Sequence, residues 1–283
     1  MQAERFLELL TSPRTLVMGV LNVTPDSFSD GGKYLDADAA IRRAFTMLDE
    51  GADILDIGGQ STRPPGKTYG SGADDVIVDK ELLRVLPVIE GIVKGNQKAI
   101  ISIDTTKAEV ARRAIDIGTT IVNDVSGGTQ DKSMFDAASS MNAPIILMHG
   151  YGPKFQKNNI EEYHYNDVVG QVGAWLERRI TLARQTGIKT VLADIGFGFA
   201  KTAEDNIALL KHHAEFTCLG VPMVLGVSRK STIGKMLGGV PPEERIIGSI
   251  AAAVWGATNG AKILRVHDVK ETVQAMKVVS ALR

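Results

Sequence analysis

The chain has 283 residues and a formal net charge of −1, with 32 Lys plus Arg against 33 Asp plus Glu. This balance gives no support to a nucleic-acid partner or an anionic membrane surface as partner. Cys218 is the only cysteine in the sequence, which excludes an intrachain disulfide and a cysteine-rich metal site.

The first residues carry charges where a signal peptide has an uninterrupted apolar core, and no later apolar run is long enough to span a bilayer. We therefore expect a cytoplasmic protein without a membrane partner. Phe6, Leu9 and Leu10 have the spacing of one face of a short helix, which we expect to close the floor of the fold. We treat residues 1–14 as an N-terminal extension of a single domain that covers residues 1–283.

Eight apolar, β-branched segments recur along the chain, and each is followed by a helical pattern. The predicted strands are residues 16–21, 53–58, 99–104, 120–124, 144–149, 190–196, 222–228 and 261–267. The predicted helices are residues 38–50, 79–94, 107–116, 132–141, 166–186, 204–213, 230–237, 242–259 and 269–282. Strict alternation predicts a parallel sheet with right-handed crossovers, and eight units favour closure into a (β/α)₈ barrel. The alternative is a doubly wound open sheet, which gathers its site at one switch point.

Nearly every predicted strand ends in an ionisable or amide side chain. These residues are Asn22, Asp56, Asp104, Asn123, His149, Asp194, Ser228 with Lys230, and Arg265 with His267. Any one of them is equally well interpreted as a satisfied core residue. The complete set is not, because catalytic groups of (β/α)₈ barrels converge on the carboxyl ends of the strands. The pattern therefore favours the barrel and predicts a site at its mouth.

The predicted rim has two kinds of chemistry. Asp104, Asn123 and Asp194 offer hydrogen-bond acceptors, which suit a ligand edge rich in N–H donors, such as that of a pterin or guanine. A second group offers donors or positive charge, and suits a phosphate or diphosphate. Its members are Arg63, Lys230, Arg265 and His267.

Asn22 follows the first predicted strand, where it is placed to hold Mg²⁺ together with such an anion, because this ion takes few protein ligands and prefers phosphate oxygens. No residue pairing in the sequence resembles a covalent catalytic system.

Several motifs, taken together, resemble dihydropteroate synthases. They are LNVTPDSFSDGG at 21–32, STRP at 61–64, Asp104, the Asn123-Asp124 pair, GFGF at 196–199, SRKS at 228–231 and RVHD at 265–268. The resemblance runs from about residue 16 to the C-terminus. It implies a TIM barrel that joins 6-hydroxymethyl-7,8-dihydropterin diphosphate to p-aminobenzoate and releases diphosphate, with Mg²⁺ as cofactor. Homodimers are usual in this family.

The resemblance also implies a role for each matching residue. The pterin would be held by Asp104, Asn123, Asp194 and Lys230, with Arg265 packed on its ring. Asn22 would meet Mg²⁺ and the diphosphate, with Arg63 and His267 on the same anion. p-Aminobenzoate would be surrounded by Thr62, Arg63, Pro64, Phe199 and Ser231. Arg63, Lys230, Arg265 and His267 would be the catalytic residues.

The sequence departs from the family pattern around the p-aminobenzoate pocket. Gln60 replaces a usual Glu, Ile195 a common Pro and Ala200 a Gly, and the loop after residues 61–64 is longer than usual. We hypothesise that this pocket discriminates against sulfonamides more strongly than that of a family member with a short loop.

Two other functions remain open from the sequence. One is pterin-dependent methyl transfer to a corrinoid protein on the same barrel, and the other is a barrel that binds pterin without turnover. An alanine-rich helix face at residues 251–257 has two possible uses, packing on the barrel or on a partner subunit.

Overall fold

The computed structural model describes residues 2–24, 33–60, 76–150 and 165–282, except for the side chains of residues 33–36. Predicted residues Thr62, Arg63 and Pro64, and most of the lengthened loop after them, lie outside the described residues.

Eight strands form one closed parallel barrel, in which each strand pairs with the next and the last pairs with the first. They are β1 (Leu16–Asn22), β2 (Ile54–Gly58), β3 (Ile101–Asp104), β4 (Ile121–Asp124), β5 (Ile145–Met148), β6 (Val191–Asp194), β7 (Met223–Leu225) and β8 (Ala261–Val266). Each has buried β-branched and aliphatic residues on both faces, as a strand between a barrel core and covering helices requires. The predicted (β/α)₈ barrel is confirmed, and the open-sheet alternative is wrong.

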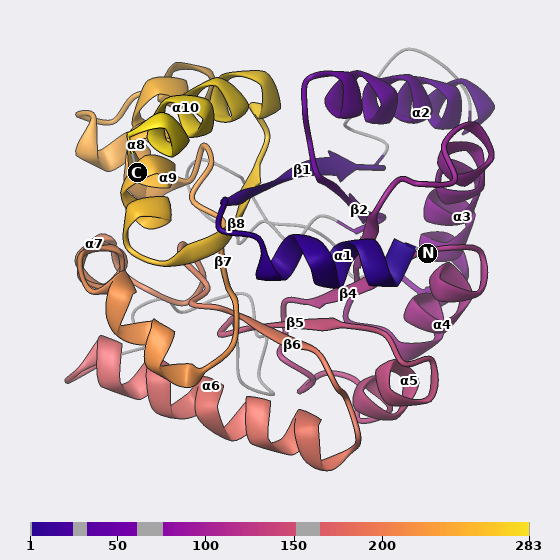
Figure 1. The fold of residues 1–283 in the computed structure, drawn as a ribbon, viewed down its shortest axis with the longest axis horizontal. Coiled ribbons are helices and arrows are strands. Elements are labelled where there is room, and N and C mark those ends of the chain that lie inside the picture. The colour runs from indigo at the N-terminus through magenta and orange to yellow at the C-terminus, as the bar shows by residue number, and fades with distance from the viewer. Residues whose placement is uncertain (1, 25–32, 61–75, 151–164, 283) are drawn as a thin grey trace.

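Helices surround the barrel in a ring, as Figure 1 shows. They are α2 (Lys33–Asp49), α3 (Val78–Gly95), α4 (Ala108–Asp116), α5 (Met134–Ser140), α6 (Val168–Gln185), α7 (Ala203–Lys211), α8 (Ser231–Met236), α9 (Ile246–Thr258) and α10 (Val269–Ala281). Eight of the nine predicted helices are present as single helices. The largest core cluster lies between this ring and the strands.

Two local predictions were wrong. Residues 242–259 do not form one helix, because Pro242 opens a 3₁₀ helix, η4 (Pro242–Arg245), before α9 begins. The buried Arg245 side chain fixes this turn by donating to the carbonyls of Val240 and Arg229. A second 3₁₀ helix, η3 (His213–Leu219), follows α7 where no helix was predicted.

Helix α1 (Gln2–Thr11) closes one end of the barrel, as its apolar spacing predicted. Phe6 is fully buried there, in a cluster with residues of the barrel interior. That cluster is Leu16, Met18, Ile54, Ile100, Ile121, Ile146, Leu192, Val224 and Ile263. Figure 1 shows α1 crossing the middle of the view, inside the ring of helices. The barrel is therefore packed at this end, and its strands open at their carboxyl ends.

Candidate active site

Arg265 links two buried carboxylates across the mouth of the barrel. Its Nε lies 2.6 Å from Asp56 Oδ2, and its terminal NH₂ lies 2.6 Å from Asp104 Oδ2. Asn123 donates its side-chain amide to the same Asp56 oxygen, at 3.1 Å. β2, β3, β4 and β8 each contribute one of these four residues. The strand register places Asp104 beside both Gly58 and Asn123, so acceptors from neighbouring strands lie at one level.

The two carboxylates keep one oxygen each for a ligand. Within the described part of the chain, Asp56 Oδ1 and Asp104 Oδ1 are buried and have no hydrogen-bond partner. A buried acceptor without a donor is costly, which makes N–H groups of a ligand the natural partners. Burial raises the pKa of Asp104 to about 7, although the Arg265 guanidinium acts in the opposite direction.

Lys230 and Asp194 form a second pair of charges at the mouth. Burial raises the pKa of Asp194, and the charge of Lys230 opposes that shift. Asp194 Oδ1 accepts from the Gly196 N–H at 2.7 Å. Burial also lowers the pKa of Lys230 to about 8, against the charge of Asp194. The Lys230 ammonium donates to the Phe197 carbonyl and lies 4.6 Å from the centre of the Phe199 ring.

The last two sequence motifs are tied together by side-chain contacts. The Ser228 hydroxyl oxygen accepts from the His267 N–H at 3.2 Å and lies 3.0 Å from His267 Nδ1, which orients the imidazole. The next residue, Arg229, pairs with Asp268 through its guanidinium. Because Arg229 has a left-handed backbone with φ 57°, this pairing also holds the turn that carries Lys230.

The structure therefore brings most of the predicted pterin residues together. Asp104, Asn123 and Arg265 are in one hydrogen-bonded group, and Asp194 with Lys230 lies next to it through their mutual charges and that of Arg265. Arg265 and Lys230 were also grouped with an anion site. Their nitrogens contact carboxylates, a carbonyl and an aromatic ring of the protein, and their role toward an anion stays a prediction.

The remaining predicted residues have different positions. Phe199 is buried beside Val125 and Met148 in a small cluster of its own, beyond the main cores. Ser231 is the first residue of α8, directly after Lys230. Asn22 ends β1 and is half-buried, with its register partner Gly58 next to Asp104. Thr62, Arg63 and Pro64 lie outside the described residues, so their roles stay predictions, as does the sulfonamide hypothesis.

Sequence reasoning missed one buried cation near the mouth. The Lys201 ammonium lies 3.0–3.1 Å from the carbonyls of His149, Gly196 and Phe199. It is also 3.0 Å from His149 Nδ1. Burial lowers the pKa of Lys201 to about 7 and that of His149 to about 3, so the imidazole is neutral at pH 7. The sequence contains a signal for this buried cation, because Lys201 directly follows an uncharged run of Gly, Phe and Ala at residues 196–200. A run of this kind is expected to be buried, so the charge next to it would not be solvated.

Comparison with known proteins decides the family of this barrel. A family model described as "Pterin binding enzyme" matches residues 18–267. A dihydropteroate synthase of Synechocystis is 45% identical over 271 residues, which is 95% of this chain and 90% of that protein. The chain belongs to the pterin binding enzyme family.

Solved structures of family members agree. A Xanthomonas albilineans dihydropteroate synthase with 4-aminobenzoic acid has a TM-score of 0.87 and 44% identity, over 95% of this chain and 93% of that one. The enzyme of the same organism in complex with 7,8-dihydropteroate has a TM-score of 0.83 and 41% identity, over 95% and 94% of the two chains. The family thus includes enzymes solved with the substrate and the product that the sequence motifs predicted.

The single amide oxygen at the end of β1 fits a magnesium ion that takes most of its ligands from water and substrate. Asn22 supplies one amide oxygen, and among the described residues no group of three or more His, Cys, Asp or Glu could hold a metal ion. Mg²⁺ commonly keeps several waters and binds substrate phosphates with one or two protein ligands. An ion at Asn22 would therefore depend on the diphosphate of the pterin substrate for most of its non-water ligands.

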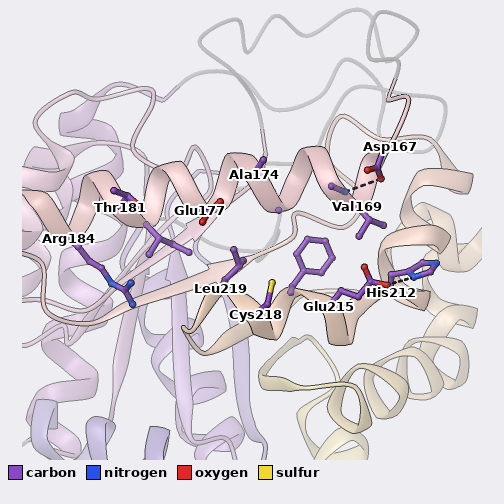
Figure 2. A pocket seen from close by; sticks show the side chains of 14 residues that line it. Asp167, Val169, Ala174, Glu177, Thr181, Arg184, His212, Glu215, Cys218 and Leu219 are labelled. Carbon is purple, nitrogen blue, oxygen red and sulfur yellow. Dashed lines mark hydrogen bonds and ion pairs between the residues drawn. The ribbon is translucent and has the colours of Figure 1, made fainter.

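A separate hollow of about 720 Å³ lies outside the barrel mouth, between α6 and η3. Figure 2 shows Thr181 and Arg184 of α6 on one side and Cys218 and Leu219 of η3 on the other. Its described lining contains none of the predicted site residues.

In the described part of the chain, no helix has the length and apolar character to cross a membrane.

Proposed function

We propose that this chain is a dihydropteroate synthase, a transferase that condenses 6-hydroxymethyl-7,8-dihydropterin diphosphate with p-aminobenzoate to 7,8-dihydropteroate and diphosphate. The observation that carries this proposal is the pair of buried oxygens, Asp56 Oδ1 and Asp104 Oδ1, without protein partners in the described chain. They lie at the mouth of a barrel whose relatives are dihydropteroate synthases.

Pterin recognition follows from the chemistry of these acceptors. The amino-pyrimidinone edge of a pterin presents several N–H groups, and Asp104, Asn123 and Asp194 supply carboxylate and amide oxygens at the level where the strands end. Arg265 is held flat between two carboxylates, so its guanidinium plane is fixed before any ligand binds. A fixed planar cation next to the acceptors is a suitable surface for a flat heterocycle.

The reaction breaks the C–O bond between the pterin methylene and the diphosphate, and forms a C–N bond to the amine of p-aminobenzoate. Positive charge left on the methylene is shared by the electron-rich dihydropterin ring, and the carboxylates of Asp56, Asp104 and Asp194 favour it electrostatically. The amine attacks with its own lone pair and loses a proton after the bond has formed. Because a neutral aromatic amine is nucleophilic, no strong base at the mouth is needed.

The leaving diphosphate needs positive charge as it forms. We assign this role to His267, whose imidazole is oriented by Ser228, and to Arg63 of the STRP motif. Bound Mg²⁺, held by Asn22, would neutralise the same anion.

The main test is diphosphate release by the purified protein with p-aminobenzoate present or omitted. Release only when both substrates are present supports the synthase. Pterin binding without release would indicate a barrel that only binds, and methyl transfer to a corrinoid without any need for p-aminobenzoate would indicate the other enzyme class.

A variant pair tests the anion side. Arg63→Ala and His267→Ala should lower turnover with the diphosphate substrate, while binding of a pterin that lacks phosphate stays nearly unchanged. His212→Ala is the matched control, because His212 is exposed and lies away from the mouth. Equal loss of both pterin ligands would argue against a role on the leaving group.

We also infer a homodimer and a cytoplasmic location. The dimer is supported by an exposed apolar stripe on α9, where Ile247, Ala251 and Trp255 follow one another at intervals of one turn. Ala252, Ala253 and Ala257 of the same helix pack on the barrel, so the alanine-rich segment has a separate face for each use. The cytoplasmic location is supported by the single cysteine in the sequence.

A further inference from the structure

The side chain of Lys201 turns back beneath the loop that precedes it. Lys201 is 6% exposed, and its ammonium donates to three carbonyl oxygens and lies 3.0 Å from His149 Nδ1. Two of the carbonyls belong to the loop between β6 and α7, at Gly196 and Phe199, and the third belongs to His149 after β5. One buried cation therefore joins the loops of two neighbouring strands.

The loop at residues 196–200 has a backbone that depends on this cation. Gly196, Gly198 and Ala200 have positive φ angles of 67°, 84° and 48°. A Cβ on Gly196 would lie 1.8 Å from the His149 carbonyl oxygen, so the two loops are in direct backbone contact. In this arrangement several carbonyl oxygens point at one buried spot, where they would repel one another and lack donors if the ammonium were removed.

The other side of the same loop faces the proposed active site. Lys230 donates to the Phe197 carbonyl and lies over the Phe199 ring, while Asp194 accepts from the Gly196 N–H. The Phe199 ring packs with Val125 and Met148 at the carboxyl ends of β4 and β5. The direction of this ring is consequently set by a backbone that Lys201 holds from below.

Two neighbours of Lys201 are themselves held by contacts outside the loop at residues 196–200. The His149 ring meets the Trp175 ring of α6 edge-on, with centroids 5.0 Å apart. The Tyr165 hydroxyl donates to the Ala200 carbonyl at 3.3 Å. Aromatic groups of the β5–α6 side therefore support His149, which lies against the ammonium, and Ala200, which precedes Lys201.

We propose that Lys201 is a positioning residue for p-aminobenzoate, which acts by holding residues 196–200 in the conformation that aims Phe199 into the barrel mouth. This inference rests on the proposed function and on the predicted place of Phe199 beside p-aminobenzoate, which the resemblance implies. Lys201 touches no reacting atom in this scheme. Its effect falls mainly on one substrate, because the pterin acceptors Asp104 and Asn123 are held by Arg265 and Asp56, although Asp194 and Lys230 also contact the loop.

The test is Lys201→Met, which keeps most of the side-chain volume and removes the charge and the N–H donors. We expect the KM for p-aminobenzoate to rise by about 10- to 100-fold, since misplacement of a positioning group by about 1 Å costs on that order. The Kd for the pterin diphosphate should rise by a smaller factor, because Asp104 and Asn123 do not depend on this loop. Lys262→Met is the matched control, because Lys262 donates to the carbonyls of Ser12 and Arg14 in the connection between α1 and β1. It should lower the melting temperature without changing either substrate constant.

A double-mutant cycle asks whether Lys201 acts through Phe199. Phe199→Leu alone should raise the KM for p-aminobenzoate, and adding Lys201→Met to it should have much less effect than in the wild type. Additive effects, an unchanged KM for p-aminobenzoate, or equal losses for both substrates would overturn the proposal. If Lys201→Met does not fold, Lys201→Gln keeps an amide donor toward the carbonyls, and the same outcomes apply to it.

Failure of the proposed function would look different. In that case the wild-type protein would release no diphosphate when both substrates are present. The positioning role fails only when the wild type is active and the variant shows no selective loss toward p-aminobenzoate.

Discussion

At the barrel mouth, the carboxylates of Asp56, Asp104 and Asp194 face the cations Arg265 and Lys230. Arg265 contacts two of the carboxylates directly, and Lys230 interacts with Asp194 through its charge. Lys201 also acts on Asp194 by its charge, so three buried carboxylates and three buried cations share this end of the barrel, where Asp56 Oδ1 and Asp104 Oδ1 lack donors among the described residues. A ligand that brings N–H donors would partner these oxygens, and the carboxylates would favour positive charge that develops on it.

Asp194 can be tested by a substitution that preserves its bond to the protein. In Asp194→Asn the side-chain oxygen can still accept from the Gly196 N–H, which Asp194 Oδ1 now does at 2.7 Å. The new NH₂ group then faces the ligand, and a donor meets a donor. We expect a loss of about 2–4 kcal/mol, or roughly 30- to 1,000-fold in Kd for the pterin diphosphate.

The measurement for Asp194→Asn is isothermal titration calorimetry. Asp53→Asn is the control, because Asp53 pairs with Arg14 and accepts from the Val17 N–H near the amino ends of the strands. Unchanged affinity in Asp194→Asn would remove this residue from the pterin site.

We expect Asp104 to give pterin binding a pH dependence. Burial raises its pKa from 3.8 to about 7, so the free protein gains a proton there as the pH falls below about 7. A ligand N–H needs the ionised oxygen, and binding must then displace this proton. We expect the Kd to rise by up to about tenfold for each pH unit below 7, and to be flat above it.

The same raised pKa has an opposite consequence for folding. Between pH 3.8 and about 7 the folded chain keeps a proton on Asp104 that the unfolded chain has lost. The contribution of Asp104 to the free energy of unfolding therefore falls as the pH rises through this window.

The pH dependence of pterin binding is measured by calorimetry between pH 6 and 8.5 on the wild type and on Asp104→Asn. A pH slope that persists in the variant would assign it to another group.

At the level of elements, α1 closes the floor of the barrel, and we expect it to contribute to stability without affecting substrate binding. Phe6 is fully buried among the interior residues of the strands, at the end opposite the mouth. We expect Phe6→Ala to lower the free energy of unfolding by about 3–5 kcal/mol, because it leaves a cavity in a closed core. Both substrate constants should stay unchanged. Urea denaturation and steady-state kinetics measure the two effects.

Leu7→Ala is the control on the same helix. Leu7 is 43% exposed, so its truncation should cost less than about 1 kcal/mol. If Phe6→Ala weakened substrate binding as much as stability, the floor and the mouth would be coupled, contrary to this expectation.

The elements were predictable because each strand carries its own local signal. A run such as Ile145–Met148 is wholly apolar and half β-branched, and helices were found by their spacing to within a few residues. The exceptions depended on distant contacts. The turn of η4 is fixed by Arg245 through the carbonyl of Arg229, a contact that no local pattern encodes.

The site was predictable in its members but not in its connections. Strand ends identified Asp104, Asn123 and Arg265 as rim residues, because parallel strands bring their carboxyl ends to one edge. That Arg265 joins Asp104 to Asp56 depends on strand stagger and side-chain rotamers, and the sequence contains neither. Lys201 was missed for the same reason, since its partners include a carbonyl 52 residues away.

In the molecule as a whole, the apolar residues that stabilise the barrel and the charged residues proposed for the reaction lie in different places. Interior residues near α1 and the layer between strands and helices are apolar, while charged groups gather at the other end. The site combines strands from β1 to β8, so it exists only when the barrel is closed. All the described residues proposed to hold the pterin lie in one barrel, so we expect that part of the site to form without a second copy.

The proposed dimer can be tested on this basis. Ile247 is 83% exposed and Trp255 is 48% exposed on α9, and the Trp255 ring is fixed by its bond to the Leu210 carbonyl at 2.8 Å. A rigid, exposed apolar stripe of this kind is typical of a subunit interface. We expect the wild type to sediment as a dimer and Ile247→Glu to sediment as a monomer, because the new charge would be buried in the interface. Leu83→Glu is the matched control, since Leu83 is 69% exposed on α3 and should leave the dimer intact. The monomeric variant should retain the wild-type Kd for the pterin diphosphate, as the described pterin residues belong to one barrel. A wild type that sediments as a monomer, or an Ile247→Glu variant that stays dimeric, would show that α9 is not the interface.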